Sequence, residues 1–142
     1  MKSGIGRRIV LVVGGIIFLT VVVVAVWTGL TQHSRQQTKV IRLELQQIQT
    51  ALRDYFRDHP GADAAWPAFF VAGQGPKTVW CASQQTEAVV WNLPETIKDY
   101  LYQFPVDPSK EVKGVSLYFY QHDDSGRRLG SCTEAADFFL TL

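Results

Sequence analysis

The stretch IVLVVGGIIFLTVVVVAVWTGL, residues Ile9 to Leu30, decides how the rest of the chain can be organised. It contains no formally charged residue, and valine, isoleucine and leucine dominate it. As a helix that rises about 1.5 Å per residue it would span about 33 Å, close to the roughly 30 Å hydrocarbon core of a bilayer. A strand of this length would be unusual, because strands rarely exceed about ten residues. The stretch therefore predicts a transmembrane helix over residues 9–30.

Basic residues flank this stretch on both sides. Three precede it, in the basic N-terminus of residues 1–8, and three follow it: Lys2, Arg7, Arg8, Arg35, Lys39 and Arg42. The size and the cysteines of the C-terminal part favour an N-terminus inside the cell and a domain outside it. Trp27 lies near the outer end, where an interfacial tryptophan belongs. A cleaved signal peptide is the competing interpretation, but its apolar region would be only about 7–15 residues long.

The composition narrows the possible functions. The 142-residue chain leaves about 110 residues after the apolar stretch, enough for one domain with a modest core. Its net charge of +1 argues against nucleic-acid binding, which usually requires a basic face. Metal-ligand spacing, a phosphate-binding glycine loop and a GxSxG motif are all missing from the sequence. We therefore expect no enzyme activity, no cofactor and no small-molecule substrate.

Two cysteines, Cys81 and Cys132, follow the apolar stretch. An even number of cysteines beyond a membrane segment predicts one disulfide in an oxidising compartment. Two buried free thiols are the alternative. A bridge closing a loop of about 50 residues would contribute roughly 4 kcal/mol by the loop-entropy argument.

Apolar residues recur at spacings of three and four from Val40 onward, which predicts an amphipathic helix within residues 31–61. The apolar stripe that would pack against the head consists of Ile41, Leu45, Ile48, Leu52 and Tyr55 or Phe56. His59-Pro60-Gly61 should end this helix, because the residue before a proline avoids the helical region. The helix either continues without a break from the apolar stretch or bends at Gly29.

Residues 62–142 are expected to form a globular head. Residues 62–90 lack periodicity, and we interpret them as a connecting region. Asn92 is expected to cap a helix that carries apolar residues to Phe104 and ends at Pro105. Strands are predicted within residues 115–120, 127–133 and 138–142, with a turn over 123–126. The predicted fold class is α+β, with the long N-terminal helix packed on a small antiparallel sheet.

Three acidic residues flank the predicted strand pair: Asp107, Asp123 and Asp124. If the fold brought them together, their oxygens would suit Ca²⁺. We favour the simpler interpretation, in which they are solvated turn residues and no metal binds.

Three further stretches resemble the type IV pilin superfamily, which includes the major pseudopilins of type II secretion. They are IQTALRDYFRDHPGADAAWP (48–67), LPETIKDYLYQFPVDPSK (93–110), with its PxDP passage, and the tyrosine-rich LYFYQHDDSGRRLGSCTEA (117–135). The resemblance implies a pilin-like fold in a bacterial inner membrane and a structural role in a pilus or a secretion filament. It also implies self-association through the N-terminal helix. Gly14 and Gly15 would permit close helix packing, or else they form a flexible point.

The N-terminus departs from the pattern of that superfamily. Its members usually carry a short basic leader and a glutamate five residues into the mature chain, where it pairs with a neighbouring subunit. Here Gly4 and Gly6 are followed by IGRRI and RRIVL, and Glu44 is the first acidic residue. The leader-cleavage motif is therefore not matched. The alternative function is a single-pass membrane protein that does not polymerise and whose outer domain binds a partner.

Overall fold

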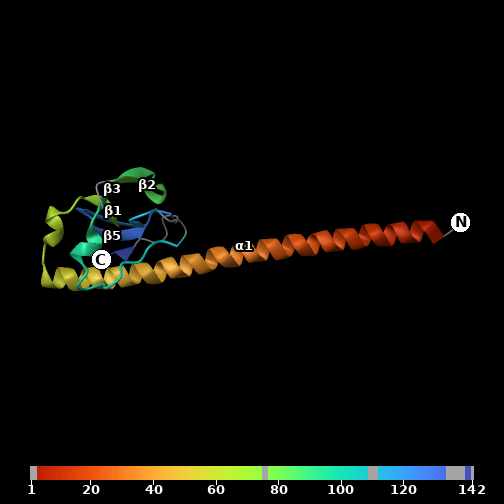
Figure 1. Ribbon diagram of the computed structural model, residues 1–142, viewed down its shortest axis with the longest axis horizontal. Helices are drawn as coiled ribbons and strands as arrows, with labels where there is room; N and C mark the ends of the chain where they lie inside the picture. The colour runs from red at the N-terminus through yellow and green to blue at the C-terminus, as the bar shows by residue number, and fades with distance from the viewer. Residues whose placement is uncertain (1–2, 75–76, 109–111, 134–139, 142) are drawn as a thin grey trace. The chain divides into compact units, whose positions relative to one another are not determined.

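The computed structural model describes residues 3–74, 77–108, 112–133 and 140–141 (Figure 1). The chain divides into two compact units, residues 1–36 and 37–142. Parts of three predicted segments lie outside the described residues: 1–2 of the basic N-terminus, 75–76 of the connecting region, and 138–139 and 142 of the last strand.

Helix α1 covers Ser3–Asp58 and stays helical through Gly29, where the sequence allowed a bend. It ends just before His59-Pro60-Gly61, as predicted. Within the first unit, the large apolar side chains described from Val12 to Leu30 are all exposed. This unit therefore supplies an apolar surface that the protein's own atoms leave uncovered.

Within the second unit, α1 buries one face. The four aliphatic members of the predicted stripe have no exposed surface: Ile41, Leu45, Ile48 and Leu52. Phe56 is partly buried against the same cluster. Across from them lie side chains of the sheet, including Phe70, Tyr118, Tyr120 and Leu129. We call this cluster the helix-side core, and Figure 1 shows the sheet beside the C-terminal part of α1.

A mixed sheet forms the other layer, with the strand order β2-β3-β1-β4-β5-β6. The strands are β1 Phe69–Gly73, β2 Thr78–Cys81, β3 Thr86–Trp91, β4 Val115–Asp123, β5 Gly126–Ser131 and β6 Leu140–Thr141. Neighbouring strands are antiparallel except β1 and β3, which run parallel. The α+β class is thus confirmed, but the antiparallel sheet is wrong, because after β1 the chain forms edge strand β2 and returns as β3 between the two.

Strands β1 to β3 lie in residues 69–91, most of which the sequence presents as a connecting region. That interpretation is wrong, since these residues form three strands of the sheet. Periodicity does not reveal β1, because this strand is buried on both faces. Phe70, Val71 and Ala72 are all buried, so their run shows none of the alternation that identifies a half-exposed strand. In β3 the alternation is present, with Ala88 and Val90 buried and Val89 between them exposed.

Helix α2 is shorter than predicted and spans Leu93–Thr96. Its start is as predicted, since the Asn92 side chain accepts a hydrogen bond from the Glu95 backbone N–H at 3.4 Å. Short 3-10 segments η1 (Ala62–Ala65) and η2 (Ala82–Gln84) complete the helical elements described.

The predicted helix to Phe104 is wrong beyond Thr96. The Ile97 carbonyl accepts the backbone N–H groups of Tyr100 and Leu101, both at 2.9 Å, so successive turns replace the helix. Ile97 is fully buried, and Tyr100, Leu101 and Phe104 pack partly buried against the helix-side core. Successive turns thus bring apolar side chains spaced three and four residues apart into the core, and the same spacing in the sequence predicts a longer helix.

The opposite face of the sheet encloses a second cluster, which we call the inner core. It comprises Val71, Cys81, Ala88, Val90, Val115, Leu117, Phe119 and Cys132. Cys81 ends β2 and Cys132 follows β5, and three strands lie between β2 and β5 in the sheet. In a flat sheet they would be about 19 Å apart, yet their Cα atoms are 4.5 Å apart. The sheet therefore curls around the inner core.

A bulge at the start of β4 helps to make this curl. The register between β1 and β4 shifts between Val71 and Gly73, and Leu117 adopts a left-handed backbone with φ 62°. That conformation costs a non-glycine residue about 1 kcal/mol. The Leu117 carbonyl accepts the backbone N–H of Cys132 at 2.8 Å. The bulge thus holds the end of β5 close to the start of β4.

Replacing Leu52 by aspartate should unfold the second unit. An unpaired carboxylate would be buried at a position with no exposed surface, which costs about 4 kcal/mol or more. Limited proteolysis of the purified full chain should cut Leu52→Asp within residues 62–133 and leave the exposed control Gln46→Asp intact. Equal protease resistance of the two variants would show that this face does not support the head.

Candidate functional site

The apolar part of α1 is the first candidate site. Within the described residues this one helix is long and apolar enough to cross a membrane. None of its most apolar part is buried inside the protein. Length and composition therefore fit a single membrane crossing, and they would fit a signal sequence as well.

The predicted assembly residues lie on this surface. A Cβ atom added at Gly14 or Gly15 would meet nothing within 4 Å. The Trp27 side chain is 73% exposed. The two glycines thus leave an unobstructed place where a neighbouring helix can approach the backbone closely.

A polar contact joins α1 to the centre of the sheet. The Tyr118 hydroxyl of β4 donates a hydrogen bond to the Glu44 carboxylate of α1. Burial raises the pKa of Glu44, the bond from Tyr118 opposes the rise, and nearby Asp107 adds to it. Burial also raises the pKa of Tyr118. Glu44, the first acidic residue of the chain, is therefore engaged within the head.

A second contact fixes the segment that follows α1. Asp63 of η1 is 6% exposed and receives two bonds from Arg127 of β5, Nε at 2.6 Å and Nη2 at 2.9 Å. The Tyr120 hydroxyl donates to the same carboxylate at 2.9 Å, and the Arg127 guanidinium lies 4.4 Å from the centre of the Phe56 ring. The bonds from Arg127 hold the pKa of Asp63 below its ordinary value. Sequence reasoning missed this group, because 64 residues separate its two charged members.

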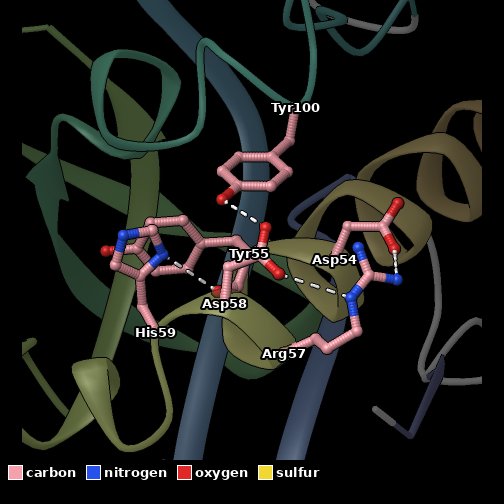
Figure 2. A network of polar contacts seen from close by, with 6 residues as sticks. All are labelled: Asp54, Tyr55, Arg57, Asp58, His59 and Tyr100. Carbon is pink, nitrogen blue, oxygen red and sulfur yellow. Dashed lines mark hydrogen bonds and ion pairs between the residues drawn. The ribbon is translucent and has the colours of Figure 1, made fainter.

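An exposed network surrounds the C-terminal end of α1 (Figure 2). Arg57 bridges Asp54 at 2.8 Å and Asp58 at 3.4 Å. The Tyr100 hydroxyl donates to Asp58 at 2.9 Å and ties the segment after α2 to the helix end. His59 Nδ1 lies 3.2 Å from the Tyr55 carbonyl oxygen. Because exposed ion pairs contribute little to stability, these contacts position the end of the helix rather than hold the fold.

The three candidate calcium ligands are not brought together. Asp107 is 1% exposed and accepts hydrogen bonds from the Ser131 and Thr133 hydroxyls. Asp123 accepts the Ser125 backbone N–H at 2.8 Å within the turn, and Asp124 is exposed. No group of three or more His, Cys, Asp or Glu residues in the described part of the chain could hold a metal ion. The favoured turn role thus applies to Asp123, whereas Asp107 is a buried anchor point for the end of β5.

The predicted disulfide between Cys81 and Cys132 is confirmed, and the alternative of free thiols is excluded. Both cysteines are buried, with 0% and 1% exposed surface. Ser83 adds two bonds at this junction, its hydroxyl to the Ser131 carbonyl at 2.7 Å and its N–H to the Cys132 carbonyl at 3.0 Å. The end of β2 is therefore clamped to the end of β5.

An open groove lies between residues 102–106 and the start of β4. Tyr102, Phe104, Val106 and Lys113 contribute to its walls. Among the described residues that line it, Lys113 is the one charged side chain.

Comparisons with protein families, with characterised proteins and with solved structures found no match to this chain. Its function must therefore be argued from its own geometry. The polar clusters of the second unit hold elements together, and among the described residues no buried side-chain nitrogen or oxygen lacks a hydrogen-bond partner.

The cysteines should resist alkylation until the protein is reduced, because both sulfurs are bonded and buried. Replacing Cys81 and Cys132 by serine should lower the free energy of unfolding by about 4 kcal/mol, because the bridge closes a long loop. Urea unfolding of the full chain measures this loss. Rapid labelling of both cysteines without a reductant would contradict the bridge.

Ser83→Ala is the matched control for the cysteine experiment. It removes the hydroxyl bond to the Ser131 carbonyl and leaves the covalent bridge intact. Its loss of stability should be about 1 kcal/mol, the contribution of one hydrogen bond. An equal loss in the control and in the cysteine variant would show that the bridge itself adds nothing beyond the contacts around it.

Replacing Arg127 by alanine should destabilise the second unit by about 2 kcal/mol at neutral pH, because the buried Asp63 carboxylate loses its charged partner. The lowered pKa of Asp63 contributes stability that is present above the ordinary aspartate pKa and is lost as the pH falls through the folded-state value. The difference between wild type and Arg127→Ala should therefore shrink in acid. Urea unfolding at a series of pH values measures it, with the exposed neighbour Arg128→Ala as control. A difference that stays constant down to acid pH would contradict this role of Arg127.

Proposed function

We propose that the chain is a pilin-like structural subunit, anchored in a bacterial inner membrane by the apolar part of α1 and assembling through it into a pilus or a type II secretion-like filament. The observation that carries the proposal is that one helical element, α1, contains both an uncovered apolar segment and an amphipathic segment buried under the head. Such a helix joins an assembly surface to a folded domain.

The proposed orientation puts the N-terminus in the cytoplasm and the head outside the membrane. The disulfide between Cys81 and Cys132 supports an oxidising compartment for the head. Lys2, Arg7 and Arg8 support a cytoplasmic N-terminus, although a similar number of basic residues follows the apolar stretch.

The contacts between copies would form along the helix. Gly14 and Gly15 offer an unobstructed surface, and β-branched side chains surround them, which suits close packing of helices in lipid. In this proposal the head has a structural role, without catalysis, a cofactor, a nucleic acid or a small-molecule substrate.

A second function is favoured by one specific observation. Glu44 is the first acidic residue of the chain, and Tyr118 of the same head already binds its carboxylate. No carboxylate in the apolar stretch is therefore available to pair with a neighbouring amino terminus. This favours a single-pass membrane protein that stays unpolymerised and whose outer domain binds a partner.

Filament formation can be tested directly in cells that express the tagged full chain. We expect the protein to resist alkaline extraction from membranes, and immunogold electron microscopy of sheared surface material should label filaments. Mass spectrometry of the extracted protein shows whether the first residues are removed. Unlabelled surface material together with an intact N-terminus would contradict the filament and favour the second function.

Glycine variants separate assembly from anchoring. Changing Gly14 and Gly15 to leucine should leave membrane insertion unchanged and reduce cross-linking between copies several-fold, because larger side chains keep the helices apart. Val12→Leu, a change of similar character on the exposed helix, is the matched control. Cross-linking that is the same in all three proteins would place the contact between copies elsewhere.

A further inference from the structure

Strand β2 forms one edge of the sheet. Its partner is β3, and no other described strand lies on its outer side. Thr78 and Trp80 are exposed, and β2 itself contains neither a proline nor a charged residue. Natural proteins usually protect an open edge with such residues, so β2 carries little protection beyond its short length and the preceding Lys77.

The register shows which backbone groups face outward. The Val90 N–H donates to the Lys77 carbonyl at 2.8 Å, so this pair is a hydrogen-bonded one. Hydrogen-bonded and non-hydrogen-bonded pairs alternate along antiparallel strands. Thr78, opposite Val89, and Trp80, opposite Glu87, are therefore in non-hydrogen-bonded positions. Their N–H and C=O groups point away from β3, toward the open edge.

A corner with two large apolar side chains lies beside this edge, and the exposed Glu87, opposite Trp80, lies on the same face. Trp80 is 61% exposed and Val89 is 50% exposed. Val89 is paired with Phe70, whose side chain lies in the helix-side core, so the corner is an uncovered part of that same face. A strand added at β2 would place every second side chain over this face, next to Trp80.

The edge is held in place before any partner arrives. Cys81, the last residue of β2, is bonded to Cys132, and the four residues of β2 are all paired with β3. A preorganised strand loses little conformational freedom on binding, which favours affinity.

We propose that β2 binds an extended segment of a different protein by strand addition, with a β-branched or aromatic side chain of that segment packed on Trp80 and Val89. The outward main-chain groups require an extended partner, and the exposed indole selects an apolar side chain at alternate positions.

A second copy of this chain fits the edge less well. Within the second unit Glu44 contacts Tyr118 and Phe56 contacts Tyr120, so residues 44–56 of α1 advance in the same sense as β4. Antiparallel pairing of two β2 strands would reverse the strands of one copy and therefore its α1. Residues 37–58 of α1 in the two heads would then point in opposite directions, whereas copies assembling side by side through α1 would carry them in the same direction. This step rests on the membrane anchor of the proposed function.

Amide hydrogen exchange of the isotope-labelled full chain in lipid nanodiscs tests the proposal. The probe is a blocked heptapeptide, lysine–valine–threonine–valine–threonine–valine–lysine. We expect it to slow exchange of the Thr78 and Trp80 amides about tenfold when about nine-tenths of the chain is bound. The Ser125 amide, in the turn after β4, should be unaffected.

Two variants at one position provide the matched comparison. Thr78→Pro removes an outward N–H and no ladder hydrogen bond, so the fold should persist while protection of Trp80 by the peptide is lost. Thr78→Val keeps the N–H and should keep the protection. If Thr78→Pro fails to fold, Trp80→Thr replaces it and should weaken peptide binding about fivefold, because the cross-strand apolar contact is lost.

The possible results are distinct. Protection confined to Thr78 and Trp80 supports strand addition. Unchanged exchange at both amides overturns it, and so does protection without peptide that rises with the number of copies per disc, which would identify a second copy as the occupant. Alkaline extraction tests the anchor separately: a chain that leaves the membrane yet binds the peptide contradicts the proposed function and not the strand addition.

Discussion

Burial of one face of α1 against the sheet is the interaction on which the second unit depends. The face carries Ile41, Leu45, Ile48 and Leu52, and its contacts reach strands at the centre of the sheet. The remaining described helices are at most about one turn long and cannot cover a sheet alone. Polar contacts then fix the position of the helix along the sheet. Tyr118 donates a hydrogen bond to Glu44 within the packed part of α1, and Arg127 donates one to Asp63 just after the C-terminal end of α1.

The inner core lies on the opposite face of the sheet. Because α1 covers only the first face, the apolar side chains of this second face must be buried in another way. Here the sheet curls, and the bulge at Leu117 together with the bridge between Cys81 and Cys132 closes it. Gly130 of β5 leaves room for the Phe119 ring of the inner core, since a Cβ at this glycine would lie 2.6 Å from the ring. Edge strand β2 pairs with β3 alone among the described strands, and its Thr78 and Trp80 are exposed.

The sequence predicted the features that depend on local periodicity, on turn residues or on the number of cysteines. Spacing and turn chemistry predict the stripe of α1, its end just before His59-Pro60-Gly61, the cap at Asn92 and the hairpin around Ser125. It did not predict β1, whose buried run lacks alternation, or the parallel pairing that follows from it. The contact of Asp63 with Arg127 and the burial of Asp107 were also missed, because such pairs are set by topology, which spacing along the chain does not encode.

The two cores differ in what they require from their surroundings. The helix-side core is assembled by non-covalent contacts, from residues between Ile41 and Leu129. The inner core contains a covalent bond that forms only where an oxidant is present. Completion of the inner core therefore depends on the redox conditions around the chain, whereas completion of the helix-side core does not.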